Sequence, residues 1–444
     1  MNNQRENPST ARSFYCESSG HHSGNKGDIA MLKSLIGILE ENYPGSRYYI
    51  PLECDPSYFN QADVKSFVPL EDYVFADNIG PPSFMLFRPL AQAGRWFYRL
   101  VKLIRIILAA RKISKSALSQ SLPPEVMENL RAMKNSQVVF VSGGGCLNDI
   151  WKVAVFIRAG LVPLLARVMK KPVILTGCGF GPLKNRWLHL WLRFCLKKVH
   201  YIGVRDGLTS PAILRQLMVP SEKIKITGDD AFPMVADAGR EEIRKHFGME
   251  PERLVIGFNA RLKSYNQDAQ HYFQNLLEII KTVASQLQAV VLFIASDFGP
   301  SRYNDLATAR HAQELLGESV EFKYLDEPVE PERIKSLAAA CDLVLAQSYH
   351  VLVFALSAQV PAIGLYHSEY YAGKIQGLFE FVGLPDNALG LHNLSVEQAA
   401  RKILTIYRDQ NCKKQLQNAN QKWYLLHKDW ENSIISVIEN TPSN

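Results

Sequence analysis

The chain has 444 residues, of which 47% are hydrophobic and 21% are charged, and a formal net charge of +7 with a pI near 8.9. This length exceeds what one ordinary hydrophobic core organises, so it predicts two domains, and the composition excludes a largely disordered chain. The basic balance suits an anionic substrate, such as a phosphorylated donor or a lipid-linked sugar phosphate, or is simply a basic solvated surface; no interleaving of aromatic and basic residues indicates nucleic-acid binding.

Cysteine usage and apolar runs indicate the compartment. The seven cysteines include no CxxC pair, which fits neither a disulfide framework nor a thiolate zinc site, and no HExxH motif proposes a metal. The first residues are polar, and no uncharged apolar run reaches the ~20 residues that span a bilayer. We expect a cytoplasmic protein that needs no metal or cofactor; its oligomeric state stays open, a homo-oligomer included.

The first motif is the turn Gly24-Asn25-Lys26-Gly27-Asp28, which follows a short apolar strand and precedes an amphipathic helix. Asp28 is a natural N-cap. The glycines would let backbone N–H groups approach an anion at the positive end of the helix. Asn25 and Gly27 are therefore candidate substrate ligands and Asp28 a candidate base. The alternative is that the turn serves only to close an αβ unit.

Residues 84–115 form an insertion of different character, rich in Phe, Trp and Leu but also in Arg and Lys. This composition permits a basic amphipathic helix on an anionic membrane, which would place the protein at the inner membrane face. The alternative, which we favour, is a helix packed on its own domain with its basic groups reaching solvent.

From residue 137 onward, short apolar runs alternate with helical patterns, as is typical of parallel sheets with helical crossovers. The predicted strands of this part are 138–141, 173–175, 201–204 and 224–227, and the predicted helices are 149–169, 184–197 and 208–218. A second series follows, with strands at 255–258, 290–294, 320–324, 343–346 and 362–365 and an amphipathic helix at 274–287.

The two series predict two domains. Polar residues interrupt the strands near 234–250, so we place an N-terminal Rossmann-like domain at 1–235, the expected acceptor side, and a C-terminal one at 236–444, the expected donor side. Parallel sheets facing a cleft in this way are the arrangement of GT-B-like transferases. Residues 396–438 indicate two helices, and such a tail could return to the first domain.

Glycine-rich loops follow two strands of the first series. Gly143, Gly144 and Gly145 come after the first strand, and Gly179 and Gly181 after the next. Consecutive glycines are costly to order, so they suggest close approach by a ligand or another backbone. Both loops would lie at the edge where open α/β sheets bind ligands. Asp149, just beyond the first loop, is a candidate base.

Charged side chains follow the next two strands. Arg205 sits at the end of 201–204, where a guanidinium could hold a carboxylate or phosphate by two hydrogen bonds. The alternative is an ion pair with Asp206 that only holds the turn. Asp229 follows 224–227 and either enters the cleft or caps a turn.

The second series offers polar groups at comparable strand ends. Asn259 and Arg261 follow 255–258, and Ser348, Tyr349 and His350 follow 343–346. A histidine at the start of a helix can meet an anion or donate a proton, although a lone histidine is often structural.

Several motifs, in order, resemble the polysaccharide pyruvyl transferase family over residues 12–385. They are GNKGDIAML, FVSGGGCLND, LTGCGFGPL, VRDGLTS, ITGDDAF, IGFNAR and SYHVLVFALSAQVPAIGLYHSEYYAGK. The resemblance implies a GT-B-like fold, phosphoenolpyruvate as donor and a ketal pyruvate on a glycan as product. It also implies that Arg205 and His350 belong to the donor site, with Lys374 near the cleft.

This chain departs from the family at one position. The family usually reads Arg-Leu-His where this chain has Ser348-Tyr349-His350, so an expected arginine is absent. Lys374, Arg261 or Lys263 could supply the charge. Alternatively, the chain is a glycosyltransferase that uses a sugar nucleotide, or a non-catalytic relative that binds glycans.

Overall fold

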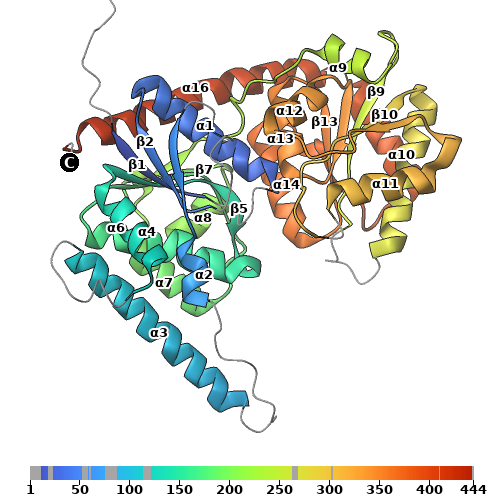
Figure 1. Cartoon of the computed structure of the whole chain (residues 1–444). Coiled ribbons are helices and arrows are strands. Elements are labelled where there is room, and N and C mark those ends of the chain that lie inside the picture. The colour runs from blue at the N-terminus through green and yellow to red at the C-terminus, as the bar shows by residue number, and fades with distance from the viewer. Residues whose placement is uncertain are drawn as a thin grey trace, which may run out of the picture.

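A computed structural model describes residues 12–18, 24–52, 59, 62–75, 88–113, 122–262, 269–301, 304–409 and 411–442. Two sheets, each built of parallel pairs, organise the chain into two halves that lie side by side (Figure 1). We call the part around the first sheet the first half and the part around the second sheet the second half.

The first sheet has the strand order β3-β2-β1-β4-β6-β7-β8, and β5 pairs with β6 beside this path. Its strands are β1 (Ser13–Glu17), β2 (Arg47–Ile50), β3 (Asp63–Ser66), β4 (Val138–Val141), β5 (Gly144–Leu147), β6 (Val173–Phe180), β7 (Tyr201–Val204) and β8 (Ile224–Ile226). All four residues of β4 are buried, as expected for a strand covered on both faces.

The second sheet has the order β11-β10-β9-β12-β13-β14. Its strands are β9 (Val255–Asn259), β10 (Val290–Phe293), β11 (Phe322–Tyr324), β12 (Leu343–Ala346), β13 (Ala362–Tyr366) and β14 (Ala388–Gly390). Both sheets therefore repeat the doubly wound order in which the first strand of each lies near the middle. The two Rossmann-like domains in a GT-B-like arrangement are confirmed.

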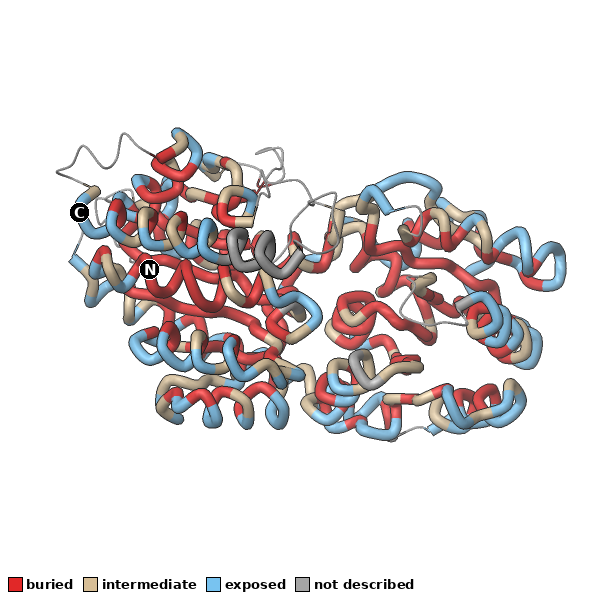
Figure 2. The backbone as a smooth tube through the Cα atoms, turned by 90° about the horizontal axis from the view of Figure 1, so that it is seen from below, coloured by how far each residue is buried: buried red, intermediate tan, exposed pale blue. Residues whose placement is uncertain are grey.

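Helices cover the faces of both sheets, and Figure 2 shows buried strands flanked by helices with exposed outer turns. In the first half they are α1 (Lys26–Asn42), α2 (Leu70–Phe75), α3 (Arg88–Lys112), α4 (Pro124–Asn135), α5 (Lys152–Ala154), α6 (Val162–Val168), α7 (Arg186–Leu196) and α8 (Thr209–Gln216). The later ones are α9 (Arg240–His246), α10 (Ala269–Leu287), α11 (Asp305–Leu316), α12 (Pro331–Ala339), α13 (Tyr349–Ser357), α14 (Glu369–Phe381), α15 (Val396–Arg408) and α16 (Asn411–Glu439).

The structure corrects several predicted boundaries. The predicted loop after residue 175 is largely strand, because β6 continues to Phe180 and pairs there with β5. The predicted helix 149–169 is broken into a 3-10 turn, α5, a π-helical turn (Val155–Leu161) and α6. β11 begins at Phe322, two residues later than predicted. The domain limits of 1–235 and 236–444 stay a prediction, although the last strand of the first sheet ends at Ile226.

The start of α1 joins the two halves. The backbone N–H of Lys26 donates to the carbonyl of Ser296 at 3.1 Å, and that of Phe298 donates to the carbonyl of Gly24 at 2.8 Å. The buried Nζ of Lys26 also pairs with Glu330 of the second half at 3.1 Å. This tip of the first half is therefore fixed against the second sheet.

The last helix, α16, crosses from the second half back to the first (Figure 1). Trp423 stacks on Phe232 with ring centroids 3.8 Å apart, and Trp430 packs into the core beside β1 and β2. Near its end, Glu439 pairs with Arg12 at 3.2 Å. The returning tail, left open by the sequence, is present.

The insertion forms the long helix α3, which contacts α6 and contributes Ile106, Ala109 and Ala110 to the core of the first half. In the described part of the chain, no helix is both long and apolar enough to cross a membrane. The buried face of α3 agrees with the favoured prediction of a helix packed on its own domain.

Candidate functional site

Arg205 lies at the carboxyl end of β7, where glycines of the neighbouring strands leave room for its side chain. Its backbone N–H donates to the carbonyl of Cys178 at 3.1 Å. A Cβ added to Gly179 would lie 2.5 Å from Nε of Arg205, and a Cβ added to Gly145 would lie 2.6 Å from its Nη2. Glycine at both positions leaves room for the end of the arginine side chain, which a larger residue would displace.

The other glycines of these loops have different roles. A Cβ on Gly143 would lie 2.2 Å from the carbonyl oxygen of Thr176, and Gly144 pairs with Cys178 in the ladder between β5 and β6. Close strand packing explains both without a ligand. Gly181 has a φ of 106° and borders the pocket described below.

Tyr349 and His350 begin α13 in the second half and meet Arg205 of the first. The guanidinium carbon of Arg205 lies 4.0 Å from the centroid of the Tyr349 ring, a cation–π contact. The His350 ring meets Tyr349 edge-on and presses on Gly27 of α1, where an added Cβ would lie 1.9 Å from Nδ1. The two predicted donor-site residues, from opposite halves, thus share one cluster.

Asp229 connects these two residues. Its Oδ2 atom lies 3.8 Å from Nη1 of Arg205 and 3.8 Å from Nε2 of His350. Its Oδ1 accepts a hydrogen bond from the backbone N–H of Ala231 at 2.9 Å, which orients the carboxylate. Among the described residues, neither Oδ2 of Asp229 nor Nε2 of His350 has a partner at hydrogen-bonding distance. These two buried polar atoms, 3.8 Å apart, therefore have unsatisfied hydrogen-bonding capacity.

Burial and charge set the protonation of this pair. Burial raises the pKa of Asp229 to about 6, although Arg205 opposes the rise. Burial lowers the pKa of His350 well below its usual range, and the positive charges of Arg205, Arg261 and Lys374 lower it further. His350 is therefore neutral at neutral pH while these cations are not offset.

Lys374, on α14, brings a second cation to Arg205. The Cβ added to Gly145 would lie 2.6 Å from Nζ of Lys374 as well as from Arg205. A pocket of about 210 Å³ opens here, with Arg205, Tyr349 and Lys374 in its wall. The pocket is thus positively charged and lies between residues of the two halves.

Arg261 extends the cationic region on the second-half side. Its Nη2 lies 3.4 Å from Oγ of Ser348 and 3.5 Å from Oγ of Ser296. Burial by itself would lower the pKa of Arg261, but the nearby carboxylates of Asp305 and Asp297 raise it. Arg261 therefore stays charged beside Ser348.

A hydrogen-bond network fixes Ser348. Its Oγ lies 2.9 Å from Oγ of Ser296, and its backbone N–H donates to Oδ1 of Asn259 at 3.0 Å. Nδ2 of Asn259 in turn donates to Asp305 at 3.1 Å. Asn259, predicted as a ligand, therefore acts in this structure as a support for the start of α13.

The turn before α1 differs from its prediction. The N-cap of α1 is Asn25, whose Oδ1 accepts from the N–H of Gly27 at 3.2 Å, and Asp28 lies inside the first turn. The N–H groups of Gly27 and Lys26 are thus used internally rather than offered to an anion. Asp28 remains near the site, because its charge contributes to the raised pKa of Asp229.

Asp149 lies in a loop and supports it. Its carboxylate accepts hydrogen bonds from the backbone N–H groups of Lys184 and Asn185. These contacts hold the segment that leads into α7. Asp149 therefore has a structural role in this loop. Asp229, which lies close to Arg205, and Asp28, whose charge acts on Asp229, are the better candidates for the base.

Ser296 and Asp305 belong to the site region but escaped the sequence reasoning. Ser296 follows β10 at the same carboxyl edge, so the rule that selected Asn259 could have selected it too. Asp305 is the first residue of α11 and resembles an ordinary helix start. Asp230, next to Asp229, was not predicted as a site residue. Lys263, which was considered as a source of positive charge, lies outside the described residues.

Within the described ranges, no group of three or more His, Cys, Asp or Glu side chains is arranged to hold a metal ion.

Sequence comparison identifies relatives over most of the chain. The model of one family, described as polysaccharide pyruvyl transferase, matches residues 25–369. The amylovoran biosynthesis protein AmsJ of Erwinia amylovora is 19% identical over 387 residues, which cover 84% of this chain and 87% of that protein.

Similar solved structures support the fold. Staphylococcus aureus MnaA with UDP has a TM-score of 0.59 at 12% identity, covering 98% of this chain and 99% of that one. Anabaena HepE in complex with UDP has a TM-score of 0.54 at 14% identity, covering 96% and 100%. A putative UDP-N-acetylglucosamine 2-epimerase from Listeria monocytogenes has a TM-score of 0.57 at 14% identity, covering 98% of each chain. At these identities the likeness shows the fold alone.

Proposed function

Because this chain belongs to the polysaccharide pyruvyl transferase family, we propose that it moves the pyruvyl group of phosphoenolpyruvate onto sugar hydroxyls of a polysaccharide or its lipid-linked precursor, forming a ketal. One observation carries the proposal: Arg205 and His350, from opposite halves, both lie 3.8 Å from the same carboxylate oxygen of Asp229. A charged pocket between the halves adjoins them.

Phosphoenolpyruvate carries a carboxylate and a phosphate, and the pocket offers matching charge. Arg205 and Lys374 converge at Gly145 and line the space of about 210 Å³. A guanidinium can hold a carboxylate or phosphate by two hydrogen bonds, while the lysine acts as a point charge. We assign these two cations to the donor.

Arg261 is our candidate for the charge that the family places at position 348. Its guanidinium reaches Oγ of Ser348 at 3.4 Å from the end of β9. The positive charge would thus lie close to its usual place, although it comes from another strand. A serine at 348 is therefore compatible with an anionic donor.

His350 is our candidate for the general acid. Burial lowers the pKa of His350, and the positive charges of Arg205, Arg261 and Lys374 lower it further. A bound phosphate and carboxylate would offset these charges, raise the pKa of His350 and let it take up a proton. Transfer of that proton to the methylene carbon makes the adjacent C2 carbon electrophilic, so that a sugar oxygen can bond to it.

The remaining steps need a base and a leaving group. The proton of the attacking hydroxyl passes to Asp229 or Asp28, whose charges influence each other. A second hydroxyl then bonds to C2 while the C2–O bond to phosphate breaks, and its proton leaves with the phosphate as hydrogen phosphate, which closes the ketal. The carboxylate returns the proton of the first hydroxyl to His350, which restores the acid for the next turnover.

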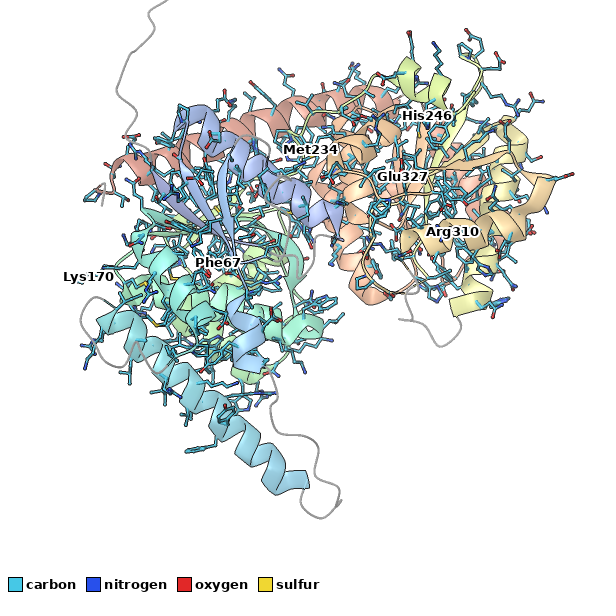
Figure 3. All side chains as sticks on the ribbon, in the orientation of Figure 1. Phe67, Lys170, Met234, His246, Arg310 and Glu327 are labelled. Atoms are coloured by element: carbon cyan, nitrogen blue, oxygen red, sulfur yellow. The ribbon has the colours of Figure 1, made fainter. Side chains whose placement is uncertain are left out.

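The test is phosphate release from phosphoenolpyruvate in the presence of candidate glycan acceptors. His350→Ala should reduce release by roughly 10²-fold or more while keeping the thermal midpoint close to that of the unchanged protein. Arg205→Lys should weaken stabilisation by phosphoenolpyruvate. His246→Ala and Arg310→Lys are matched controls, because both residues belong to the second half, are exposed and do not line the pocket (Figure 3).

Other outcomes would select another function. If no acceptor supports phosphate release and only a sugar nucleotide stabilises the protein, a glycosyltransferase replaces the proposal. If a glycan stabilises the protein without any turnover, a binding protein replaces it. An active His350→Ala variant would remove the role of the imidazole.

A further inference from the structure

Helix α3 has two apolar faces on opposite sides. Its buried face contains Ile106 and packs on the first half. The other face carries Phe97, Leu100, Ile104 and Leu108 at intervals of three and four residues, and these side chains are 69%, 52%, 47% and 40% exposed. One apolar face is enough to dock a helix on its domain, so the second face is unexplained by folding.

Helix α7 repeats the pattern. Leu188 and Leu192 face the core, while Trp187, Leu190 and Phe194 are 82%, 56% and 54% exposed. These three positions also share one side of the helix because they are three and four residues apart. Large apolar side chains grouped in this way usually mark an interaction site.

The two exposed rows belong to one layer of the molecule. Both α3 and α7 contact α6, and the guanidinium carbon of Arg167 on α6 lies 5.6 Å from the ring centroid of Phe194. Figure 1 shows α3 and α7 together at the foot of the first half. We call the exposed rows of these two helices the α3–α7 face.

The two helices of the α3–α7 face carry only positive charge, although α2, which contacts α3, adds the exposed Asp72. The sequence of α3 contains seven Arg or Lys residues and no Asp or Glu, and one of the seven, Lys102, is buried and donates to the carbonyl of Tyr73. Residues 184–198, which include α7, also lack acidic residues and contribute Lys184, Arg186, Arg193, Lys197 and Lys198. A symmetric contact between two copies would oppose these cations, whereas anionic lipid would neutralise them.

From this combination we infer that the α3–α7 face docks the protein on an anionic lipid bilayer. Exposed Trp, Phe, Leu and Ile enter the headgroup boundary, while the surrounding Arg and Lys bind lipid phosphates. No described helix could cross the membrane, so the attachment is peripheral. It goes beyond the proposed function and needs no turnover to be measured.

Docking would also bring the donor pocket to the lipid surface. Gly181, Pro182 and Lys184 line that pocket, and Trp187 follows three residues later in the same segment. Asp149 accepts hydrogen bonds from the backbone N–H groups of Lys184 and Asn185, which lie between the pocket and α7. An acceptor held on a lipid phosphate would thus be presented beside Lys184.

The test is flotation of the full chain with vesicles of phosphatidylcholine, with and without about one third phosphatidylglycerol. The unchanged protein should float with the anionic vesicles only, and less so at high salt. Trp187→Ser combined with Phe194→Ser should weaken vesicle binding by about tenfold or more, as should Arg193→Glu combined with Lys197→Glu. Tyr424→Ser with Leu425→Ser is the matched control, because both side chains are exposed, at 57% and 61%, on α16.

Three outcomes would overturn the inference. The unchanged protein could fail to distinguish anionic from neutral vesicles, or the Trp187/Phe194 variant could float as well as the control. The unchanged protein could also sediment as a dimer that this variant converts to a monomer, which would assign the face to a second copy. Phosphate release measured without vesicles tests the proposed function separately, so the two can fail independently.

Discussion

Gly145 shows how one residue shapes the charged pocket. An added Cβ would lie 2.6 Å from both Nη2 of Arg205 and Nζ of Lys374, and both atoms are ends of flexible side chains. Gly145→Ala should therefore keep the fold, displace the two cations and raise the KM for phosphoenolpyruvate about tenfold or more. Enzyme kinetics and the thermal shift caused by the donor measure this.

The control for this prediction is Gly239→Ala, where an added Cβ would meet nothing within 4 Å. It should leave the KM unchanged. An unchanged KM in Gly145→Ala as well would mean that Arg205 and Lys374 do not hold the donor at this point.

The raised pKa of Asp230 leads to a prediction of how the stability of the fold depends on pH. Burial raises the pKa of Asp230 to about 8, while the neighbouring Thr176 hydroxyl opposes the rise and the charge of Asp229 adds to it. The folded state thus binds a proton that the unfolded state has lost, and its contribution to stability, full below about pH 4, disappears as pH rises toward about 8. Asp230→Asn should raise the thermal midpoint more at pH 8 than at pH 5.

Thermal midpoints of both proteins across this pH range check the prediction, with exposed Asp386→Asn as the control. An equal effect of Asp230→Asn at pH 5 and pH 8 would contradict the proposed titration. Substitution at Asp230 rather than Asp229 keeps the test away from the candidate base.

At the scale of residues, the sequence predicted part of the site. Strand-end position selected Arg205 and His350, and the structure brings these two together. The same rule could not separate Asp229 from Asp230, because only the bond to Ala231 and the approach to Arg205 distinguish them. Lys374 sits within a helix rather than at a strand end, so only the family resemblance pointed to it.

At the scale of elements, α1 offers a test of helix propensity. Gly37 lies in the middle of this helix, is exposed, and an added Cβ would meet nothing within 4 Å. Gly37→Ala should increase the free energy of unfolding by about 0.5–1 kcal/mol, because alanine loses less conformational entropy in a helix. Urea unfolding measures the change.

Donor kinetics should be unchanged in Gly37→Ala, since the site end of α1 lies ten residues earlier. A loss of stability would show that α1 is bent or strained at this position.

The elements were predicted best where both faces of a strand are buried. The apolar runs of β4 and β12 are entirely buried, and both were identified. β3 and β14 escaped because they are short edge strands, of which β3 has no buried residue. The predicted N-cap of α1, Asp28, lies three residues after the observed one, Asn25. Asn and Asp both cap helices, so the sequence alone does not decide between them.

At the scale of the whole molecule, α16 ties the last residues to the first core. Trp430 is 2% exposed and lies among residues of β1 and β2. Trp430→Ala should lower the free energy of unfolding by about 3–5 kcal/mol, as expected for a large buried aromatic residue. Urea or thermal unfolding checks this.

Tyr424→Ala on the same helix is the control, because Tyr424 is 57% exposed. It should change stability by no more than about 0.5 kcal/mol. Equal effects of the two substitutions would mean that α16 does not hold the first half. The sequence predicts α16 as a helix but not where it packs, because an apolar helix face does not specify which core it will contact.

The pocket wall is shared between the halves, with Arg205 on one side and Tyr349 on the other, and the ion pair of Lys26 with Glu330 closes the same junction. Under the proposed function, donor affinity and the association of the two halves are reciprocally coupled: a donor anion in the pocket would tighten the junction, and a change that loosens the junction would weaken donor binding. Dissolved ions screen the charges at the junction and also compete with the donor for the cations of the pocket. Donor affinity should therefore fall more steeply with ionic strength than the modest net charge of the chain suggests.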